Sequence, residues 1–105
     1  MNIMGQGTTP YLQIAIDGYD MSGATAIVVT IEHGKHKLNL TDERVTVTAN
    51  EEGSVVTVHL TQQETLAIDK GFAEIQVRWK DQYGDAFSTE ILNVNVLKAL
   101  YRGVI

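Results

Sequence analysis

The chain has no cysteine, one proline and few aromatic residues among its 105 residues. The lack of cysteine excludes disulfide frameworks, thiolate zinc sites and cysteine nucleophiles. Long apolar runs are also missing: residues 26–29 form the longest, far short of the ~20 residues that a membrane span needs. The first residues contain no basic region followed by an apolar run, so no signal peptide is expected. We therefore expect synthesis in the cytoplasm and no membrane partner.

The chain also lacks any concentration of positive charge. Its net charge is −5, and its eight basic residues are scattered along the sequence. A protein that binds a phosphate backbone usually carries a basic patch or stripe, so nucleic acid is not an expected partner. Apolar residues make up 44% of the chain and charged residues 20%, which is typical of a folded globular domain of this length.

Apolar side chains recur at every second position through most of the chain, the pattern of half-buried β-strands. The clearest example is the stretch 73–80, where Ala73, Ile75, Val77 and Trp79 alternate with polar residues. Turn sequences separate about seven such stretches. This spacing predicts an all-β fold, an antiparallel β-sandwich of two sheets, with a small open barrel as the alternative.

Two places depart from simple alternation. Thr61 and Glu64 have the spacing of a capping box, which predicts one short helical turn between strands. Near Ile91 the alternation changes parity. That change indicates either a β-bulge or a strand that leaves one sheet for the other.

We expect residues 1–7 to form a flexible N-terminal arm and residues 8–105 a single sandwich domain with a C-terminal tail. The tail is rich in apolar residues and has no obvious place inside a closed sandwich. It either covers a sheet edge of its own domain or adds to the edge of a neighbour. Its members are the first candidates for an interaction surface: Leu97, Leu100, Tyr101, Val104 and Ile105.

No residue pattern predicts a catalytic, cofactor-binding or metal-binding site. His33 and His36 lie three apart in a turn, and a zinc site would need further ligands. Asp81 and Asp85 bracket another turn, where solvated acids are expected more often than calcium ligands. No serine lies in a nucleophile-elbow pattern. We therefore expect a protein that is not an enzyme and needs no cofactor.

Aromatic side chains offer a second hypothesis, a platform for stacking on carbohydrate. Trp79 shares its parity with Ile75 and Val77, so it is expected in the core. Tyr19 lies in a loop and Tyr83 in a turn, and both are expected to be exposed. They complete the candidate interaction surface.

The order of several short motifs resembles a group of small proteins encoded in phages and prophages of Gram-positive bacteria. The matching segments lie between residue 7 and the end of the chain: Gly7-Thr8-Thr9-Pro10, Leu60-Thr61-Gln62-Gln63-Glu64-Thr65, Ala73-Glu74-Ile75-Gln76-Val77-Arg78 and Leu97-Lys98-Ala99-Leu100-Tyr101-Arg102-Gly103-Val104-Ile105. The chain is also broadly similar to the N-terminal immunoglobulin-like domains of phage baseplate proteins.

The resemblance implies an immunoglobulin-like fold and a structural role in a phage tail or baseplate. It implies protein–protein assembly with other phage structural proteins or with copies of itself, and virion association where the phage is functional. It supplies no site residues. Our leading hypothesis is therefore a non-enzymatic assembly protein, and the alternative is a carbohydrate-binding module that contacts the host surface.

Overall fold

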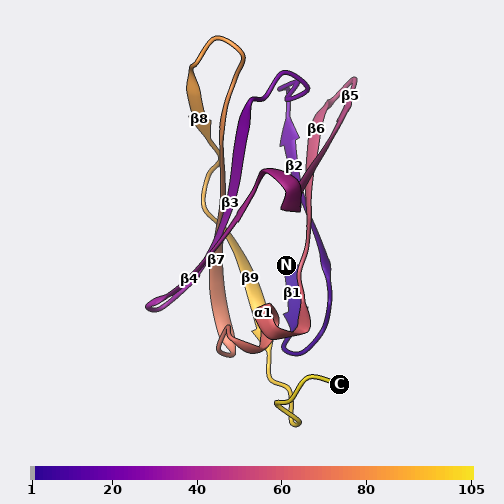
Figure 1. Ribbon diagram of the computed structural model, residues 1–105, viewed down its shortest axis with the longest axis vertical. Helices are drawn as coiled ribbons and strands as arrows, with labels where there is room; N and C mark the ends of the chain where they lie inside the picture. Colours follow the sequence, from indigo (N-terminus) through magenta and orange to yellow (C-terminus); the bar gives the residue numbers. More distant parts are fainter. Residues whose placement is uncertain (1) are drawn as a thin grey trace.

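The computed structural model describes residues 2–105 and comprises two β-sheets packed face to face (Figure 1). The larger sheet has the strand order β1-β9-β7-β3-β4, and β8 also pairs with β7. The smaller sheet has the order β2-β6-β5. The strands are β1 (Asn2–Gly5), β2 (Tyr11–Asp17), β3 (Ala26–His33), β4 (His36–Thr41), β5 (Val45–Asn50), β6 (Gly53–His59), β7 (Gly71–Lys80), β8 (Ala86–Ser88) and β9 (Leu92–Leu97).

This strand order identifies an immunoglobulin-like β-sandwich. The sheet β2-β6-β5 corresponds to strands B, E and D of that fold, and β4-β3-β7-β9 corresponds to C′, C, F and G. Successive strands cross repeatedly from one sheet to the other, as β2 to β3 and β6 to β7 do. The fold class expected from the sequence is confirmed, and the barrel alternative is wrong because the two sheets remain separate.

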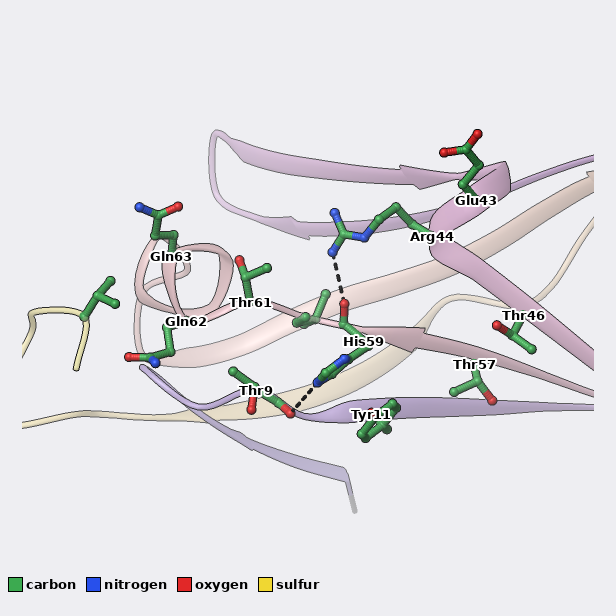
Figure 2. Close-up of a pocket in the computed structure, with 12 residues that line it drawn as sticks. Thr9, Tyr11, Glu43, Arg44, Thr46, Thr57, His59, Thr61, Gln62 and Gln63 are labelled. Atoms are coloured by element: carbon green, nitrogen blue, oxygen red, sulfur yellow. Dashed lines mark hydrogen bonds between the residues drawn. The ribbon is translucent and has the colours of Figure 1, made fainter.

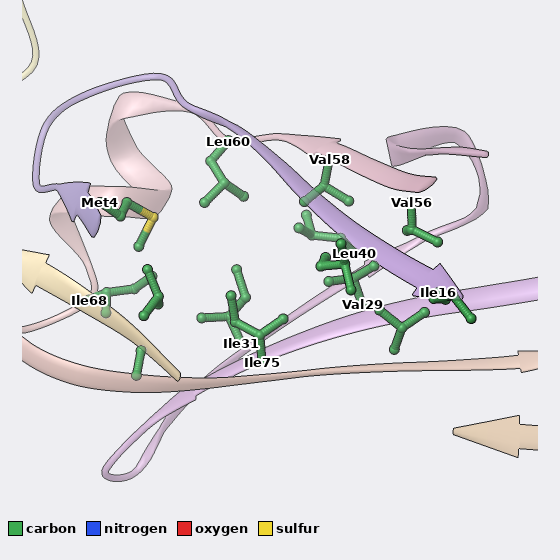
Figure 3. Close-up of a cluster of buried hydrophobic side chains, with 14 of the residues drawn as sticks. Met4, Ile16, Val29, Ile31, Leu40, Val56, Val58, Leu60, Ile68 and Ile75 are labelled. Atoms are coloured by element: carbon green, nitrogen blue, oxygen red, sulfur yellow. The ribbon is translucent and has the colours of Figure 1, made fainter. Parts of the chain in front are cut away.

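The inward-facing side chains form one continuous apolar core between the sheets (Figure 3). The inward-facing residues of β7, including Trp79, are buried as their alternation predicted. Val56 and Val58 from the smaller sheet face Val29 and Ile31 from the larger one in the same cluster. Such alternation fixes the register of each strand, because a slip of one residue would turn every apolar side chain to solvent.

Two short helical links connect the sheets. Helix α1 (Gln62–Leu66) begins at Thr61 with the expected capping box, in which the Thr61 hydroxyl accepts from the Glu64 N–H and the Glu64 carboxylate accepts from the Thr61 N–H. A second link, the 3₁₀ turn η1 (Asp42–Arg44), joins β4 to β5 and was not expected from the sequence.

The N-terminal residues depart from the expected flexible arm. Met1 lies outside the described residues, but Asn2–Gly5 forms β1 and pairs in parallel with β9. Met4 is only 1% exposed. Gln6 is also buried, where its Nε2 donates to the Ile68 carbonyl (2.6 Å) and its Oε1 accepts from the Ala99 N–H (3.1 Å). The prediction was wrong because one inward-facing methionine is too short a pattern to indicate a strand.

The parity change near Ile91 is a bulge. Ser88 of β8 pairs with Arg78 of β7, so an uninterrupted strand would place Ile91 opposite Ile75. Leu92 occupies that position instead, which means that one extra residue lies between β8 and β9. Because both strands pair with β7, the alternative of a strand that changes sheets is wrong.

Candidate functional site

The C-terminal segment, residues 97–105, leaves the sandwich at the end of β9 and extends beyond it (Figure 1). The apolar residues expected to form an interaction surface are all exposed here, from 47% for Leu97 to 92% for Leu100 and Ile105. The segment does not lie along a sheet edge of its own domain. The structure therefore places these candidates together on one projecting segment and leaves their apolar surface in solvent.

The far end of this segment returns to helix α1. The Gln62 Nε2 donates to the Ile105 carbonyl (3.1 Å), and the Gln62 Oε1 accepts from the Ile105 N–H (2.8 Å). One side-chain amide thus satisfies both backbone groups of one residue, as a neighbouring β-strand would. We call this pair of hydrogen bonds the Gln62 clamp.

Beside the clamp, an open groove of about 600 Å³ runs over the outer face of the smaller sheet (Figure 2). We call it the outer groove. Its lining comes from β2, η1, β5, β6, helix α1 and the C-terminal segment, and includes Tyr11, Glu43, Arg44, Thr46, Thr57, His59, Gln62, Gln63 and Val104. Sequence reasoning did not find this groove, because its residues come from six separate parts of the chain.

An aromatic pair forms part of the groove floor. Tyr11 and His59 occupy paired positions on β2 and β6, and their rings stack with centroids 3.9 Å apart. Their backbones are adjacent only because of the strand register. His59 is exposed, and one of its ring nitrogens lies 3.2 Å from the Thr9 carbonyl. The pair offers a flat aromatic surface beside the hydroxyl groups of Thr46 and Thr57.

An ion pair closes the groove on another side. The Arg44 Nη2 donates to the Glu64 Oε1 (2.7 Å) and to the His59 carbonyl (3.0 Å). Burial of the Glu64 carboxylate opposes its ionisation, but the hydrogen bonds from Arg44 and Thr61 outweigh that effect and hold the pKa of Glu64 below its ordinary value. The hydrogen bond with Glu64 in turn raises the pKa of Arg44.

Tyr19 follows β2 and Tyr83 is in the β7–β8 turn, and these two loops lie at the end of the molecule opposite helix α1 (Figure 1). Both tyrosines line a hollow of about 260 Å³ there. Tyr83 is 81% exposed, as expected. Tyr19 is half-buried, which corrects the expectation of an exposed loop residue. Its ring packs against Trp79 and Phe87 at centroid distances of 5.3 and 5.1 Å.

The buried Ser54 explains the position of Tyr19. The Ser54 hydroxyl donates to the Tyr19 carbonyl (2.9 Å) and accepts from the Met21 N–H (2.8 Å). These two bonds fold the loop after β2 back onto the end of β6. No sequence pattern around Ser54 distinguishes this role from that of an ordinary strand serine.

Two of the polar turn residues, Asp81 and His33, have structural partners. The Asp81 carboxylate accepts from the backbone N–H groups of Tyr83 and Asp85, which shapes the β7–β8 turn. His33, at the β3–β4 turn, places its Nδ1 2.8 Å from the Phe72 carbonyl. Within residues 2–105, no group of three or more histidine, aspartate or glutamate side chains could hold a metal ion. Neither helix of the described chain is long and apolar enough to cross a membrane.

Comparisons with known proteins add little to this geometry. No protein-family model and no curated protein matches the chain. Among solved structures, murine CRIg is similar over 92% of this chain and 90% of its own, with a TM-score of 0.44 and 11% sequence identity. A likeness this distant carries no argument about function.

Proposed function

We propose that this chain is a non-enzymatic assembly domain that associates through its C-terminal segment. The observation that carries the proposal is the exposure of five apolar side chains on residues 97–105, each between 47% and 92% exposed. Contiguous apolar surface on a folded domain is costly in water and is typical of interaction sites. The segment projects from the sandwich, so a partner can cover it without disturbing the core.

The setting that we propose is a phage tail or baseplate, or its remnant in a bacterial genome. The support is the resemblance of four ordered sequence segments to small phage and prophage proteins, the last of which is the C-terminal segment itself. Repeated copies in a symmetric assembly would allow individually weak contacts to accumulate by multivalency. In this setting the protein is made in the cytoplasm and becomes part of the virion.

Size-exclusion chromatography with light scattering tests assembly of identical copies. The protein should be compared with a shortened variant ending at Ala99, which keeps the N–H that the buried Gln6 side chain requires. We expect a discrete oligomer at high concentration that is lost in the shortened variant and in Leu100→Ser/Ile105→Ser. A polar exchange elsewhere, Gln13→Ser, should leave the oligomer unchanged. Equal masses for the full and shortened chains at every concentration would overturn the proposal.

A second candidate function is carbohydrate binding at the hollow that Tyr19 and Tyr83 share. Asp20 and Gln82 contribute polar groups to its lining. Trp79 also lines it, and the Trp79 Nε1 is the only buried side-chain nitrogen or oxygen without a hydrogen-bond partner in the described residues. Aromatic faces beside the polar groups of Asp20 and Gln82 suit a sugar ring.

Calorimetric titration with host cell-wall glycan fragments tests this second function. Tyr83→Ala and Gln82→Ala should abolish binding, whereas Tyr83→Phe should retain it because the ring remains. Tyr19 is a poor position for the test, since its ring supports Trp79 and Phe87 and its removal would also lower stability. No heat of binding from any fragment with the unmodified protein would count against carbohydrate binding.

A further inference from the structure

The Gln62 clamp binds a peptide backbone and not a particular side chain. Its two hydrogen bonds go to the N–H and carbonyl of Ile105, while the Ile105 side chain remains 92% exposed. Any residue other than proline could make the same two bonds with an extended backbone. The neighbouring residue Gln63 lines the same groove but makes no hydrogen bond to the C-terminal segment in the described structure.

Few contacts join the sandwich to its own C-terminal segment. Between Ala99 and Ile105, no residue of the segment makes a hydrogen bond to the sandwich within residues 2–105. Leu100 is 92% exposed, so closure of the segment onto its own domain buries little of its apolar surface. The contacts that hold the end in place are the clamp and the half-exposed Val104 at the outer groove.

The segment also contains a turn that no hydrogen bond of the described residues holds in place. The chain bends at Leu100, Tyr101 and Gly103 before it reaches Gln62. The Tyr101 ring lies against Gly103 so closely that a Cβ there would be 2.7 Å from the Tyr101 Oη. Straightening this turn breaks no hydrogen bond that the structure shows for residues 100–104. It would carry residues 104–105 away from their own groove.

We propose that the outer groove and the Gln62 clamp form a peptide-binding site that takes residues 103–105 of a second copy of this chain. The exchanged segment makes the same clamp and Val104 contacts as in a single copy, so exchange costs little in contact energy. It also brings the exposed Leu100 and Tyr101 of each copy between two domains, where they can be buried. This inference rests on the proposed assembly function and specifies its partner and its site.

Crosslinking of two different single-cysteine variants tests the exchange, because the chain has no cysteine of its own. One variant carries Gln63→Cys in the groove and the other Ile105→Cys, which keeps the clamped backbone. The two are mixed at high concentration and treated with a short bis-maleimide. As the matched control, Tyr83→Cys replaces Gln63→Cys. Both residues are exposed, but Tyr83 is in the β7–β8 turn, which lies at the end of the molecule opposite helix α1 (Figure 1).

We expect the Gln63→Cys mixture to give about tenfold more covalent heterodimer than the control mixture. Gln62→Glu, added to the groove variant, keeps an acceptor for the Ile105 N–H but replaces the donor to the Ile105 carbonyl with a second carboxylate oxygen. It should reduce the yield about tenfold, because the carbonyl loses its partner and faces an acceptor. Equal heterodimer in both mixtures would overturn the exchange, even if light scattering still showed an oligomer that needs residues 100–105. A raised yield that Gln62→Glu does not lower would overturn the role of the clamp.

Discussion

Arg44 and Glu64 form a two-bond ion pair that joins the 3₁₀ turn η1 to helix α1 beside the outer groove. The Arg44 Nη1 donates to the Glu64 Oε2 (3.1 Å) and the Nη2 to the Oε1 (2.7 Å). The same Glu64 Oε1 accepts from the Thr61 N–H and so completes the capping box. One carboxylate therefore holds both the start of the helix and the turn in place.

Two substitutions of Glu64 separate these roles. Glu64→Gln removes the charge but can still accept from the Thr61 N–H, so we expect a loss of about 0.5–1 kcal/mol in the free energy of unfolding. Glu64→Ala removes both interactions and should cost about 1–2 kcal/mol. Urea unfolding followed by tryptophan fluorescence measures both values. Equal losses for the two variants would show that the ion pair, and not the cap, accounts for the whole contribution of Glu64 to the free energy of unfolding.

The ion pair also predicts a pH dependence. The pKa of Glu64 is lower in the folded protein than its ordinary value of 4.5. A carboxyl with a lowered folded pKa stabilises the fold above its unfolded pKa, and this contribution is lost as the pH falls through the folded value. The stability difference between the unmodified protein and Glu64→Gln should therefore be full at pH 7 and shrink below about pH 4.5. A difference that stays constant from pH 7 to pH 3 would contradict the assignment.

Strand β1 can be tested through neighbouring residues that face opposite ways. Met4 is 1% exposed and Ile3 is 60% exposed. Met4→Ala should lower the free energy of unfolding by about 2–5 kcal/mol, because it leaves a cavity between the sheets. Ile3→Ala should cost less than about 1 kcal/mol. Similar small losses from both substitutions would restore the interpretation of residues 1–7 as an arm.

Gln6 provides a second test of the N-terminal packing. Its buried amide connects the Ile68 carbonyl to the Ala99 N–H. Gln6→Ala leaves both groups without this partner and should cost about 1–3 kcal/mol in denaturant unfolding. Gln13→Ala, at an exposed position of β2, is the matched control and should change stability by less than about 0.5 kcal/mol. Equal effects of the two substitutions would contradict the buried bridge.

The sequence predicted the features that depend on local pattern. Alternation along residues 73–80 predicted β7 and its buried face, and the Thr61–Glu64 spacing predicted the start of α1. The extra residue near Ile91 was visible as a change of parity. Each of these signals lies within a few residues, because strand pleating and helix capping are local geometry.

Tertiary structure alone decided β1, the burial of Tyr19 and the whole of the outer groove. Asn2–Gly5 became a strand because β9 offers it a free edge, and Tyr19 packs inward because Ser54, 35 residues away, binds its carbonyl. The Gln62 clamp joins residues 43 positions apart in the chain. Nothing near Gln62 distinguishes it from Gln63, because only the path of the folded chain brings a backbone within reach of one amide and not the other.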